Sequence, residues 1–420
     1  MTASDTAEAG VKGARSVAWR GGFGRLWGAV VLSSFGDGLR KAALPLLAAS
    51  LTDDPLLIAS VSACGYLPWL VFGLLGGAIA DRVDQRRAMW RVDVARGLLV
   101  AAFALAVAFG HASIGLLIAL ALVLTTFQTL FDNAATALLP ALVPRDALGS
   151  ANARLLTAQQ LASGILAAPV VPFLIAAAPA LPYGIDAATY LAGAALVASL
   201  RVPAPGHPPR SGGVTLRSDI AGGLRALWRD RVLRCLCAST AVGNVGIGAL
   251  IATLVVLVTG WLDAGPGTYA ATTTAYAAGS LAGGAVAGRL ARRLGRVRGI
   301  LLAGTAQTAA LVAMGTVRSG VALVVSMTLF GAMGMLWNVN THTLMQERAP
   351  AAMLGRISAA FRTMAIAGAP LGAVLGGAVA ALWGPNTPML LAAALFTLSV
   401  LALTPALKSA HSGQTPQTTR

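Results

Sequence analysis

The chain has 420 residues, of which 56% are hydrophobic and only 11% are charged, and its mean hydropathy is +0.74. A soluble protein carries roughly a quarter charged residues, so too few polar side chains remain here to cover a soluble surface. Composition therefore excludes a large soluble helical protein and indicates an all-α membrane protein. The net charge of +16 would suit nucleic acid only if the basic residues gathered on one face.

Apolar stretches of about 20 residues recur along the whole chain, and each is long enough to cross a bilayer as a helix. Residues 1–23 are polar and basic, without the short apolar core of a signal peptide, so we predict no removable leader. We expect twelve transmembrane helices, at residues 27–50, 56–80, 90–110, 113–139, 155–178, 182–200, 233–260, 266–288, 298–317, 320–343, 358–382 and 388–406.

Basic residues alternate along these predicted spans. Almost all Lys and Arg fall in the tails and in the loops on one side, whereas the loops on the other side hold almost none. This asymmetry is the positive-inside rule, and it predicts a multi-pass protein with both termini in the cytoplasm. The heavy use of Ala and Arg is typical of a GC-rich bacterial genome, and we expect the protein in a bacterial plasma (inner) membrane. Because the positive charge follows the membrane, we expect a lipid bilayer and no nucleic acid as partner.

Motifs of several other function classes are missing. None of the lysines, Lys12, Lys41 and Lys408, follows the glycine pattern of a nucleotide-binding loop, so no ATPase subunit is implied. The four histidines and three cysteines lack the spacing of a metal site or of a disulfide framework. We therefore expect no bound metal, no cofactor and no enzymatic activity.

The longest polar interruption covers residues 201–234 and divides the predicted spans into six plus six. It begins with VPAPGHPPRSGG, a linker by composition, and continues as TLRSDIAGGLRALWRD, whose apolar residues share one helical face. We predict a helix lying on the inner membrane surface there. The expected organisation is a tail (1–26), a six-helix bundle (27–200), a cytoplasmic linker (201–232), a second bundle (233–406) and a tail (407–420).

The two halves repeat. A shift of 207 residues places Gly76-Gly77-Ala78 on Gly283-Gly284-Ala285 and Gly36-Asp37 on Gly243-Asn244, and a shift of 206 places Pro144 on Pro350. Matches near one offset, in corresponding spans, indicate a duplicated half-chain. Parallel six-helix repeats are an architecture of secondary transporters, in which the substrate site lies near the midplane between the halves.

The segment from Gly77 to Arg87 carries a known pattern. Gly77-x-x-x-Asp81-Arg82-x-Asp84-x-Arg86-Arg87 resembles the loop 2–3 signature of the major facilitator superfamily, with Asp84 where the family usually has Gly. The resemblance implies a conformational latch made by Gly77, Asp81, Arg82, Arg86 and Arg87. The resemblance also implies that Asp81 engages the neighbouring arginines and the start of span 11, and a carboxylate is favoured at a helix N-terminus. The alternative is that these charges only anchor the topology.

Three further stretches extend this resemblance over essentially the whole chain: SSFGDGLRKAALPLL, FDNAATALLPALVPRDALGSANARL and NVNTHTLMQERAPAAMLGRISA. All three are similar to the drug-efflux branch that includes macrolide exporters and the enterobactin exporter. The resemblance implies the major facilitator fold, two pseudo-symmetric six-helix bundles, with multidrug efflux, antibiotic resistance and proton antiport. Span 11, with Gly368, Pro370, Gly372, Gly376 and Gly377, resembles an antiporter motif loosely.

Ionisable residues inside the spans are the first candidates for function, because a charge within the bilayer is costly. Asp37 lies near the middle of span 1, and Arg40 and Lys41 share its helical face. We expect Asp37, tuned by Arg40, or Asp132 in span 4 to carry a proton. The alternative is a self-neutralising pair that only holds the helix. We interpret Asp93 as a structural part of the charge network around the loop after span 2. Asp186, near the outer end of span 6, is expected at the membrane interface.

Neutral polar and aromatic residues complete the candidate site, and the alternative for each is ordinary packing. Asn244 is the strongest of them, because the repeat places it opposite Asp37. The candidates for substrate binding are Asn244, Asn338, Asn340, Tyr66, Trp69, Phe127, Tyr276, Trp337 and Phe361, and Gln128 is a further candidate for the cavity wall.

Together these patterns predict a secondary transporter that exports a small amphipathic drug or natural product by alternating access, in exchange for protons. The proton gradient would be its only energy source, and a monomer would suffice. One alternative is a dedicated exporter of a single siderophore or self-made metabolite. Another is a transport-inactive membrane receptor or scaffold, in which the intramembrane charges would be dispensable.

Overall fold

The computed structural model describes residues 22–80, 84–144, 147–200, 216–350 and 353–412, and this part of the chain is helical without any strand. Residues 148–177 form one continuous helical run whose hydrogen-bond register changes to π and then to 3-10 in its middle. The first half contains α1 (Gly22–Leu51), α2 (Pro55–Ala80), α3 (Gln85–Ala108), α4 (Ile114–Leu142), α5 (Leu148–Gln160), η2 (Leu161–Ala167), η3 (Ala168–Val170), α6 (Val171–Ala177) and α7 (Leu181–Ala198).

The second half begins with the helix expected in the linker. It contains α8 (Leu216–Arg229), α9 (Arg231–Val256), η4 (Leu257–Trp261), α10 (Pro266–Leu294), α11 (Arg296–Thr316), α12 (Gly320–Arg348), α13 (Leu354–Trp383) and α14 (Thr387–Ser412). Every predicted span overlaps one of these helices or helical runs. Eight of them, within the described residues, are long and apolar enough to cross a membrane, so the count of twelve spans stays a prediction.

Local sequence explains where several helices begin and end. Ser113 and Asp230 are N-caps: the Ser113 hydroxyl accepts a hydrogen bond from the Leu116 amide (3.3 Å), and Asp230 accepts from the Leu233 amide (2.9 Å). Gly295 and Gly384 end α10 and α13 at φ values of 78° and 102°, which favour glycine.

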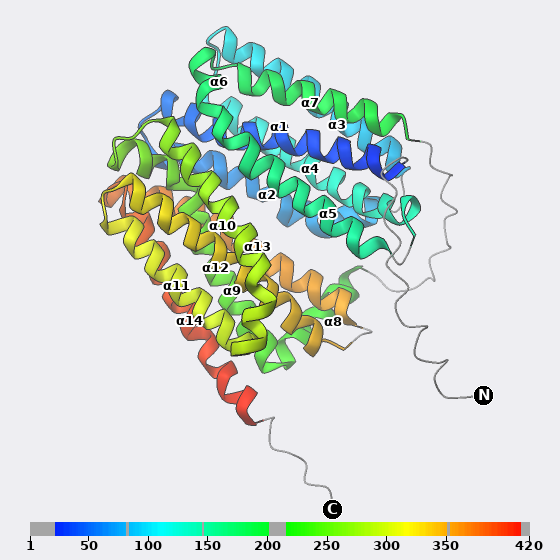
Figure 1. The fold of residues 1–420 in the computed structure, drawn as a ribbon, viewed down its shortest axis with the longest axis vertical. Coiled ribbons are helices and arrows are strands. Elements are labelled where there is room, and N and C mark those ends of the chain that lie inside the picture. Colours follow the sequence, from blue (N-terminus) through cyan, green and yellow to red (C-terminus); the bar gives the residue numbers. More distant parts are fainter. Residues whose placement is uncertain (1–21, 81–83, 145–146, 201–215, 351–352, 413–420) are drawn as a thin grey trace, which may run out of the picture.

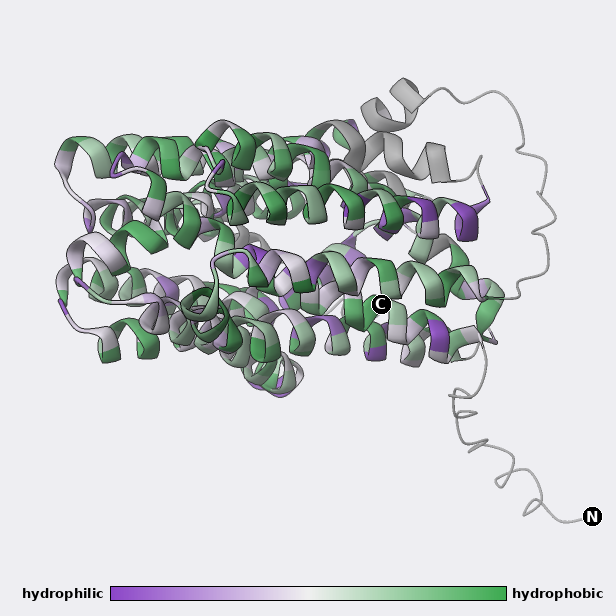
Figure 2. Cartoon of the chain, turned by 90° about the horizontal axis from the view of Figure 1, so that it is seen from above, coloured by the Kyte–Doolittle hydropathy of each residue, from purple (hydrophilic) through white to green (hydrophobic). Residues whose placement is uncertain are grey.

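The outside of the molecule is apolar. Phe109, Phe173 and Val321 have about three quarters of their surface exposed, and Figure 2 shows hydrophobic residues along most of the helix lengths. A soluble protein does not expose apolar area on this scale. The all-α membrane fold predicted from composition is therefore confirmed.

The helices form two groups, seen one above the other in Figure 1. Helices α1 and α3 both pack on α7, and α2 packs on α4; in the second group α9 packs on α13 and α14, and α12 on α10 and α11. The main contact between the groups joins α2 to α13. The exact domain boundaries stay a prediction.

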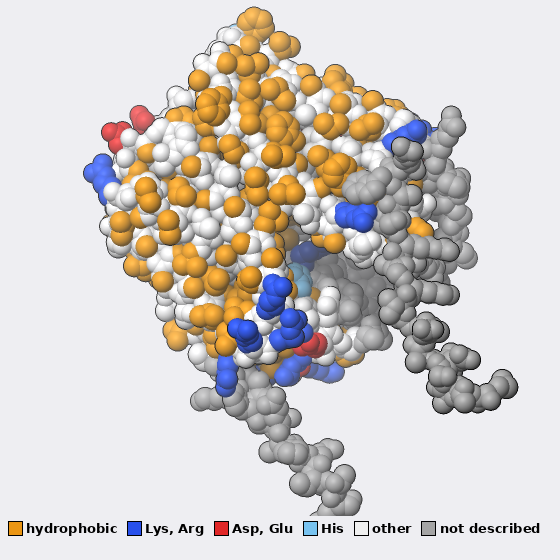
Figure 3. All heavy atoms as spheres, in the orientation of Figure 1, with side chains coloured by type: hydrophobic (Ala, Val, Ile, Leu, Met, Phe, Trp, Pro, Cys, Tyr) orange, Lys and Arg blue, Asp and Glu red, His pale blue; other side chains and the backbone are white. Residues whose placement is uncertain are grey.

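The two ends of the molecule differ in packing. We call the end that holds the start of α1, the end of α7 and α8 the linker end, and the opposite end the far end. At the far end one apolar core contains residues of both groups, including Leu46, Ile58, Leu254 and Tyr269. At the linker end, within the described residues, each group has its own core, around Phe23 in one and Leu336 in the other. The structure is thus closed at the far end and open at the linker end, where Figure 3 shows a hollow between the groups.

Far-end closure depends on close contact between α2 and α13. A Cβ atom added at Gly377 would lie 2.7 Å from the Ala59 Cβ and 3.0 Å from the Leu56 Cα, so no side chain fits there. We predict that Gly377→Leu separates the far ends of α2 and α13. Spin labels at Asp53 and Arg318, in far-end loops of the two groups, should then report a longer distance than in the parent chain.

The matched control is Gly184→Leu, because a Cβ at Gly184 would meet nothing within 4 Å. That variant should keep the parent distance. An unchanged distance in Gly377→Leu would show that this contact does not hold the far end closed.

Candidate functional site

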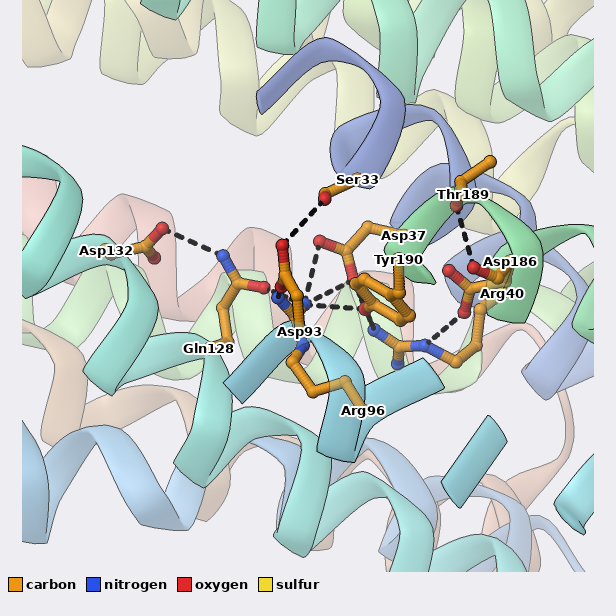
Figure 4. A network of polar contacts seen from close by, with 10 residues as sticks. All are labelled: Ser33, Asp37, Arg40, Asp93, Arg96, Gln128, Asp132, Asp186, Thr189 and Tyr190. Carbon is orange, nitrogen blue, oxygen red and sulfur yellow. Dashed lines mark hydrogen bonds and ion pairs between the residues drawn. The ribbon is translucent and has the colours of Figure 1, made fainter. Parts of the chain in front are cut away.

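Five ionisable side chains lie buried together between α1, α3 and α7 (Figure 4). Small residues let the helices approach: a Cβ at Gly36 of α1 would collide with the Thr189 hydroxyl, and one at Gly193 of α7 would lie 2.8 Å from the Ser33 hydroxyl. We call this set the charge cluster; its members are Asp37, Arg40, Asp93, Arg96 and Asp186.

Arg96 lies at the centre of the cluster and is fully buried. Its Nη1 donates to Asp93 Oδ1 at 3.1 Å, and its Nη2 lies 3.2 Å from Asp37 Oδ1. The same Nη2 donates to the Tyr190 hydroxyl at 2.6 Å, and that hydroxyl donates to Asp37 Oδ1 at 2.5 Å. One guanidinium group therefore ties a carboxylate of α1, a carboxylate of α3 and a tyrosine of α7.

Arg40 forms the second half of the cluster. Its Nη2 lies 2.5 Å from Asp37 Oδ1, and its Nε donates to Asp186 Oδ2 at 3.1 Å. Asp186 has no exposed surface. The expectation that Asp186 is interfacial is therefore wrong: α7 carries it into the interior, where Arg40 is its counter-ion. Within the described residues, Asp93 likewise belongs to this cluster through Arg96.

The cluster has an uneven charge count. Three carboxylates face two guanidinium groups, so one carboxylate is in excess when all five groups are ionised. An unbalanced charge away from water is costly. One bound proton would balance these five groups, and the Lys41 ammonium group, four residues after Asp37 on α1, offsets part of the excess from outside the cluster.

A polar side chain of α4 links the cluster to a cavity. Gln128 accepts a hydrogen bond from Arg96 Nη2 through its Oε1 and donates through its Nε2 to Asp132 Oδ1 at 2.8 Å. Asp132 is half-buried and faces the cavity, as do Asp37 and Arg40. The three residues predicted for proton coupling thus lie in one connected network.

This polar cavity has a volume of about 600 Å³. Its wall comes mainly from α1, α2 and α4, with Gln159 and Ser163 from the α5–η2 run, and α9 and α10 add Ile251 and Tyr269. Two of the predicted substrate residues, Tyr66 and Trp69, line it. Its size is that of a site for a small organic molecule.

The second group holds a smaller cavity of about 80 Å³, which we call the amide cavity. Asn244, Asn338, Tyr276 and Trp337 line it, together with the buried amide of Gln307. The structure therefore places these four predicted residues together, but in a pocket separate from Tyr66 and Trp69.

Three predicted residues line neither of these cavities. Phe361 is buried in the linker-end core of the second group. Asn340 is fully buried, and its side-chain amide donates to the Leu336 carbonyl at 2.9 Å. Phe127 is half-buried on α4, beside Gln128. Their surroundings suit packing better than ligand contact.

Sequence comparison identifies the family of this fold. A profile described as Major Facilitator Superfamily matches residues 26–365 and 245–419. The chain belongs to the Major Facilitator Superfamily. An uncharacterized MFS-type transporter of Sinorhizobium fredii, y4rN, is 30% identical over 360 residues, 84% of this chain and 86% of the relative.

Other superfamily members extend the comparison. The enterobactin exporter EntS of Escherichia coli is 27% identical over 354 residues, 82% of this chain and 82% of that protein. An uncharacterized MFS-type transporter of Mycobacterium tuberculosis, Rv0037c, is 33% identical over 141 residues, and the match spans only 32% of its length. The recognition made from the sequence motifs is thereby confirmed.

Solved structures show the same fold. The nucleoside transporter NupG superimposes with a TM-score of 0.72 at 13% identity, over 91% of this chain and 99% of that one. A bacterial homolog of the human lysosomal transporter Spinster, in an inward-facing and unoccupied conformation, gives a TM-score of 0.65 at 14% identity over 91% and 94%.

The superfamily's loop 2–3 signature is only partly visible. Asp81 and Arg82 lie outside the described residues, and Gly77 lies in the last turns of α2. Arg86 donates to the Ala198 carbonyl at the end of α7, and Arg87 Nε lies 3.3 Å from Asp84 Oδ2.

Asp84, the departure from the superfamily pattern, has a clear local role. It is the N-cap of α3, with φ −63° and ψ 106°, and its Oδ1 accepts a hydrogen bond from the Arg87 amide at 3.0 Å. A backbone with negative φ does not require glycine. Asp84 therefore fits this turn.

Sequence reasoning missed one central residue, Tyr190, whereas Gln128 was among the residues expected at the cavity wall and does line the polar cavity. Asp186 and Tyr190 are four residues apart and share one face of α7, a signal that was available. Gln128 and Asp132 have the same spacing on α4. Which helix those faces meet follows only from the tertiary packing.

The cluster predicts a large difference between two arginines. Replacing Arg96 by Gln leaves the Asp37 and Asp93 carboxylates without their shared cation, and we expect the free energy of unfolding to fall by about 3–5 kcal/mol. Arg87→Gln removes a pair at the surface, where the Arg87 side chain is 68% exposed, and should change stability by less than about 0.5 kcal/mol.

Unfolding of the purified chain in detergent, followed by helical circular dichroism, measures both values. Adding Asp93→Asn to Arg96→Gln should recover part of the loss, because it removes one uncompensated carboxylate. Equal losses for the two arginine variants would contradict a special role for Arg96.

Proposed function

We propose that this protein exports a small amphipathic drug or natural product across a bacterial plasma membrane, by alternating access and in exchange for protons. Its termini and α8 lie in the cytoplasm under this proposal, because basic side chains gather at the linker end. The observation that carries the proposal is the continuous path from the charge cluster through Gln128 to Asp132 at the wall of the polar cavity.

The packing supports a starting state for export. The molecule is open at the linker end, which is cytoplasmic in this proposal, and its groups share a core at the far end. A substrate can therefore enter the polar cavity from the cytoplasm. Release outside requires the shared core to part while the two linker-end cores meet.

Exchange requires proton and substrate to favour different states of the cavity. Asp132 is the group best placed for this, because it faces the cavity and accepts the hydrogen bond of Gln128. A proton on Asp132 removes the charge that a basic group of the substrate would bind. Asp37 is the second candidate, and the excess carboxylate of the cluster gives the proton a place there.

The latch, the energy source and the partners complete the proposed transport cycle. The loop 2–3 residues Gly77, Asp81, Arg82, Arg86 and Arg87 latch one of the two states. The proton gradient supplies the energy without a cofactor, and a single chain contains both helix groups and the cavity between them. Small-molecule substrate, proton and lipid are then its partners.

The first test uses the purified chain in liposomes that enclose a pH dye, with an acidic lumen. Lipophilic cations, macrolides and siderophores are added in turn, and we expect one class to trigger proton release. Asp132→Asn should lower this release by at least about tenfold, since a neutral amide cannot carry the proton.

Asp53→Asn, in an exposed far-end loop, is the matched control and should release protons like the parent chain. Unaltered release in both Asp132→Asn and Asp37→Asn would refute the assigned proton site. Bound ligand without any proton release would refute proton exchange and favour a receptor or scaffold.

A dedicated exporter of one metabolite is the second candidate, favoured by the relative named as an enterobactin exporter. The same liposomes separate the two. A multidrug exporter responds to several unrelated compounds, whereas a dedicated exporter responds to a single siderophore or related metabolite.

A further inference from the structure

One cation of the cavity wall makes no ion pair with the carboxylates of the charge cluster among the described residues. Lys41 lies next to Arg40 on α1, and its side chain is exposed, whereas Arg40 is 7% exposed and paired with Asp37 and Asp186. Among the described residues, no carboxylate oxygen lies within 4.0 Å of the Lys41 ammonium group. A lysine within a membrane span, facing a cavity without a contact partner, marks a binding position.

Lys41 also lies at a junction. It lines the polar cavity and, at the same time, a second space of about 270 Å³ between the two helix groups, which we call the apolar cavity. The wall of the apolar cavity comes from α1, the run from α5 through η2 to η3, α9, α10 and α12, and it includes Leu250, Leu254, Met327 and Phe330. A hydrophobic pocket thus begins where the free ammonium group lies.

We propose that Lys41 binds an anionic group of the substrate, a carboxylate or phenolate, whose apolar body occupies the apolar cavity. The ammonium group offers three hydrogen-bond donors, and an organic acid supplies the direct ion-pair partner that no described carboxylate gives it. The substrate class is then an amphiphile with an acidic group at one end. This inference rests on the proposed export function only in calling the ligand a substrate.

The position of the apolar cavity brings the ligand into contact with the second helix group as well. The apolar cavity borders Ile251 of α9, Tyr276 of α10 and Met327 of α12, all in the second group, while Lys41 belongs to the first. A ligand held by Lys41 contacts both groups at once. Its presence can therefore bias their relative position, because it interacts differently with the open and closed states.

Asp132 is a second charged residue of the same cavity wall, and its charge is opposite to that of Lys41. It also lines the polar cavity, and alone it would favour a cationic ligand. Its carboxylate accepts a hydrogen bond from Gln128 Nε2, whereas Lys41 has no such contact within the described part of the chain. Lys41 is therefore the charged group of this wall that a ligand can pair with directly without displacing a hydrogen bond among the described residues. A substrate that also carries an amine can engage both residues.

The test compares dansyl-phenylalanine with its methyl ester, which differ only in the charge of one group. Binding is followed by dansyl fluorescence on the purified chain in nanodiscs of zwitterionic lipid. We expect the parent chain to bind the acid roughly ten- to a hundredfold more tightly than the ester, the range of a hydrogen bond to a charged group. Lys41→Met should bring this ratio close to one by weakening the acid alone, and Lys41→Arg should keep most of it.

Arg318→Met removes an exposed cation of a far-end loop, which is not among the residues that line these cavities, and is the matched control. Unchanged ester binding by Lys41→Met shows that the variant is folded. The proposal is wrong if the parent chain prefers the ester or fails to bind the acid at millimolar concentration. It is also wrong if the acid preference survives in Lys41→Met, or if anionic lipid in the nanodisc abolishes acid binding, because the occupant would then be a lipid.

These outcomes are separate from those of proton exchange. A Lys41-dependent acid preference without proton release in liposomes would leave this inference standing and refute the exchange of protons. Proton release that requires Asp132, with no acid preference, would support the exchange of protons and refute the inference about Lys41.

Discussion

Arg96 holds two carboxylates of different helices away from water, and the rest of the first helix group is arranged around this interaction. A guanidinium group in a bilayer needs acceptors on every side. Asp93 supplies one from α3 itself, Asp37 supplies another from α1, and Tyr190 adds a hydroxyl from α7. The close approach of α1 and α7 at Gly36 and Gly193 is what brings these acceptors within reach.

The two groups have opposite chemistry in otherwise related positions. Asp37 of the first group corresponds to Asn244 of the second, and its surroundings change with it. The first group contains the charge cluster and the larger, polar cavity, whereas the second contains amides and aromatic rings around a small pocket. Among the described residues, the buried charges are thus concentrated in the first helix group, while the second group contributes apolar and amide surface.

Much of the fold and part of the candidate site could be predicted from the sequence, because a bilayer allows only helices and closed barrels to span it. The helical segments and the family were predictable from hydropathy and from the charged motifs. Asp37, Arg40 and Asp132 were predictable as members of one site, since charges inside spans are rare. The pairing of Arg40 with Asp186 was not, because it joins residues 146 positions apart and depends on the rotation of α7. The depth of Asp186 was misjudged for the same reason: span position alone does not tell which face of a helix meets the interior.

The pairs Asp37–Arg40 and Asp93–Arg96 are each formed within a single helix, three residues apart. This has a consequence for biosynthesis. Chains are made from the N-terminus, so α1 and α3 reach the bilayer before α7 exists, and each brings its own counter-ion with it. Asp186 arrives last, on a helix without a basic residue, and finds Arg40 already in place. The order of the charges along the chain thus matches the order in which the membrane must accept them.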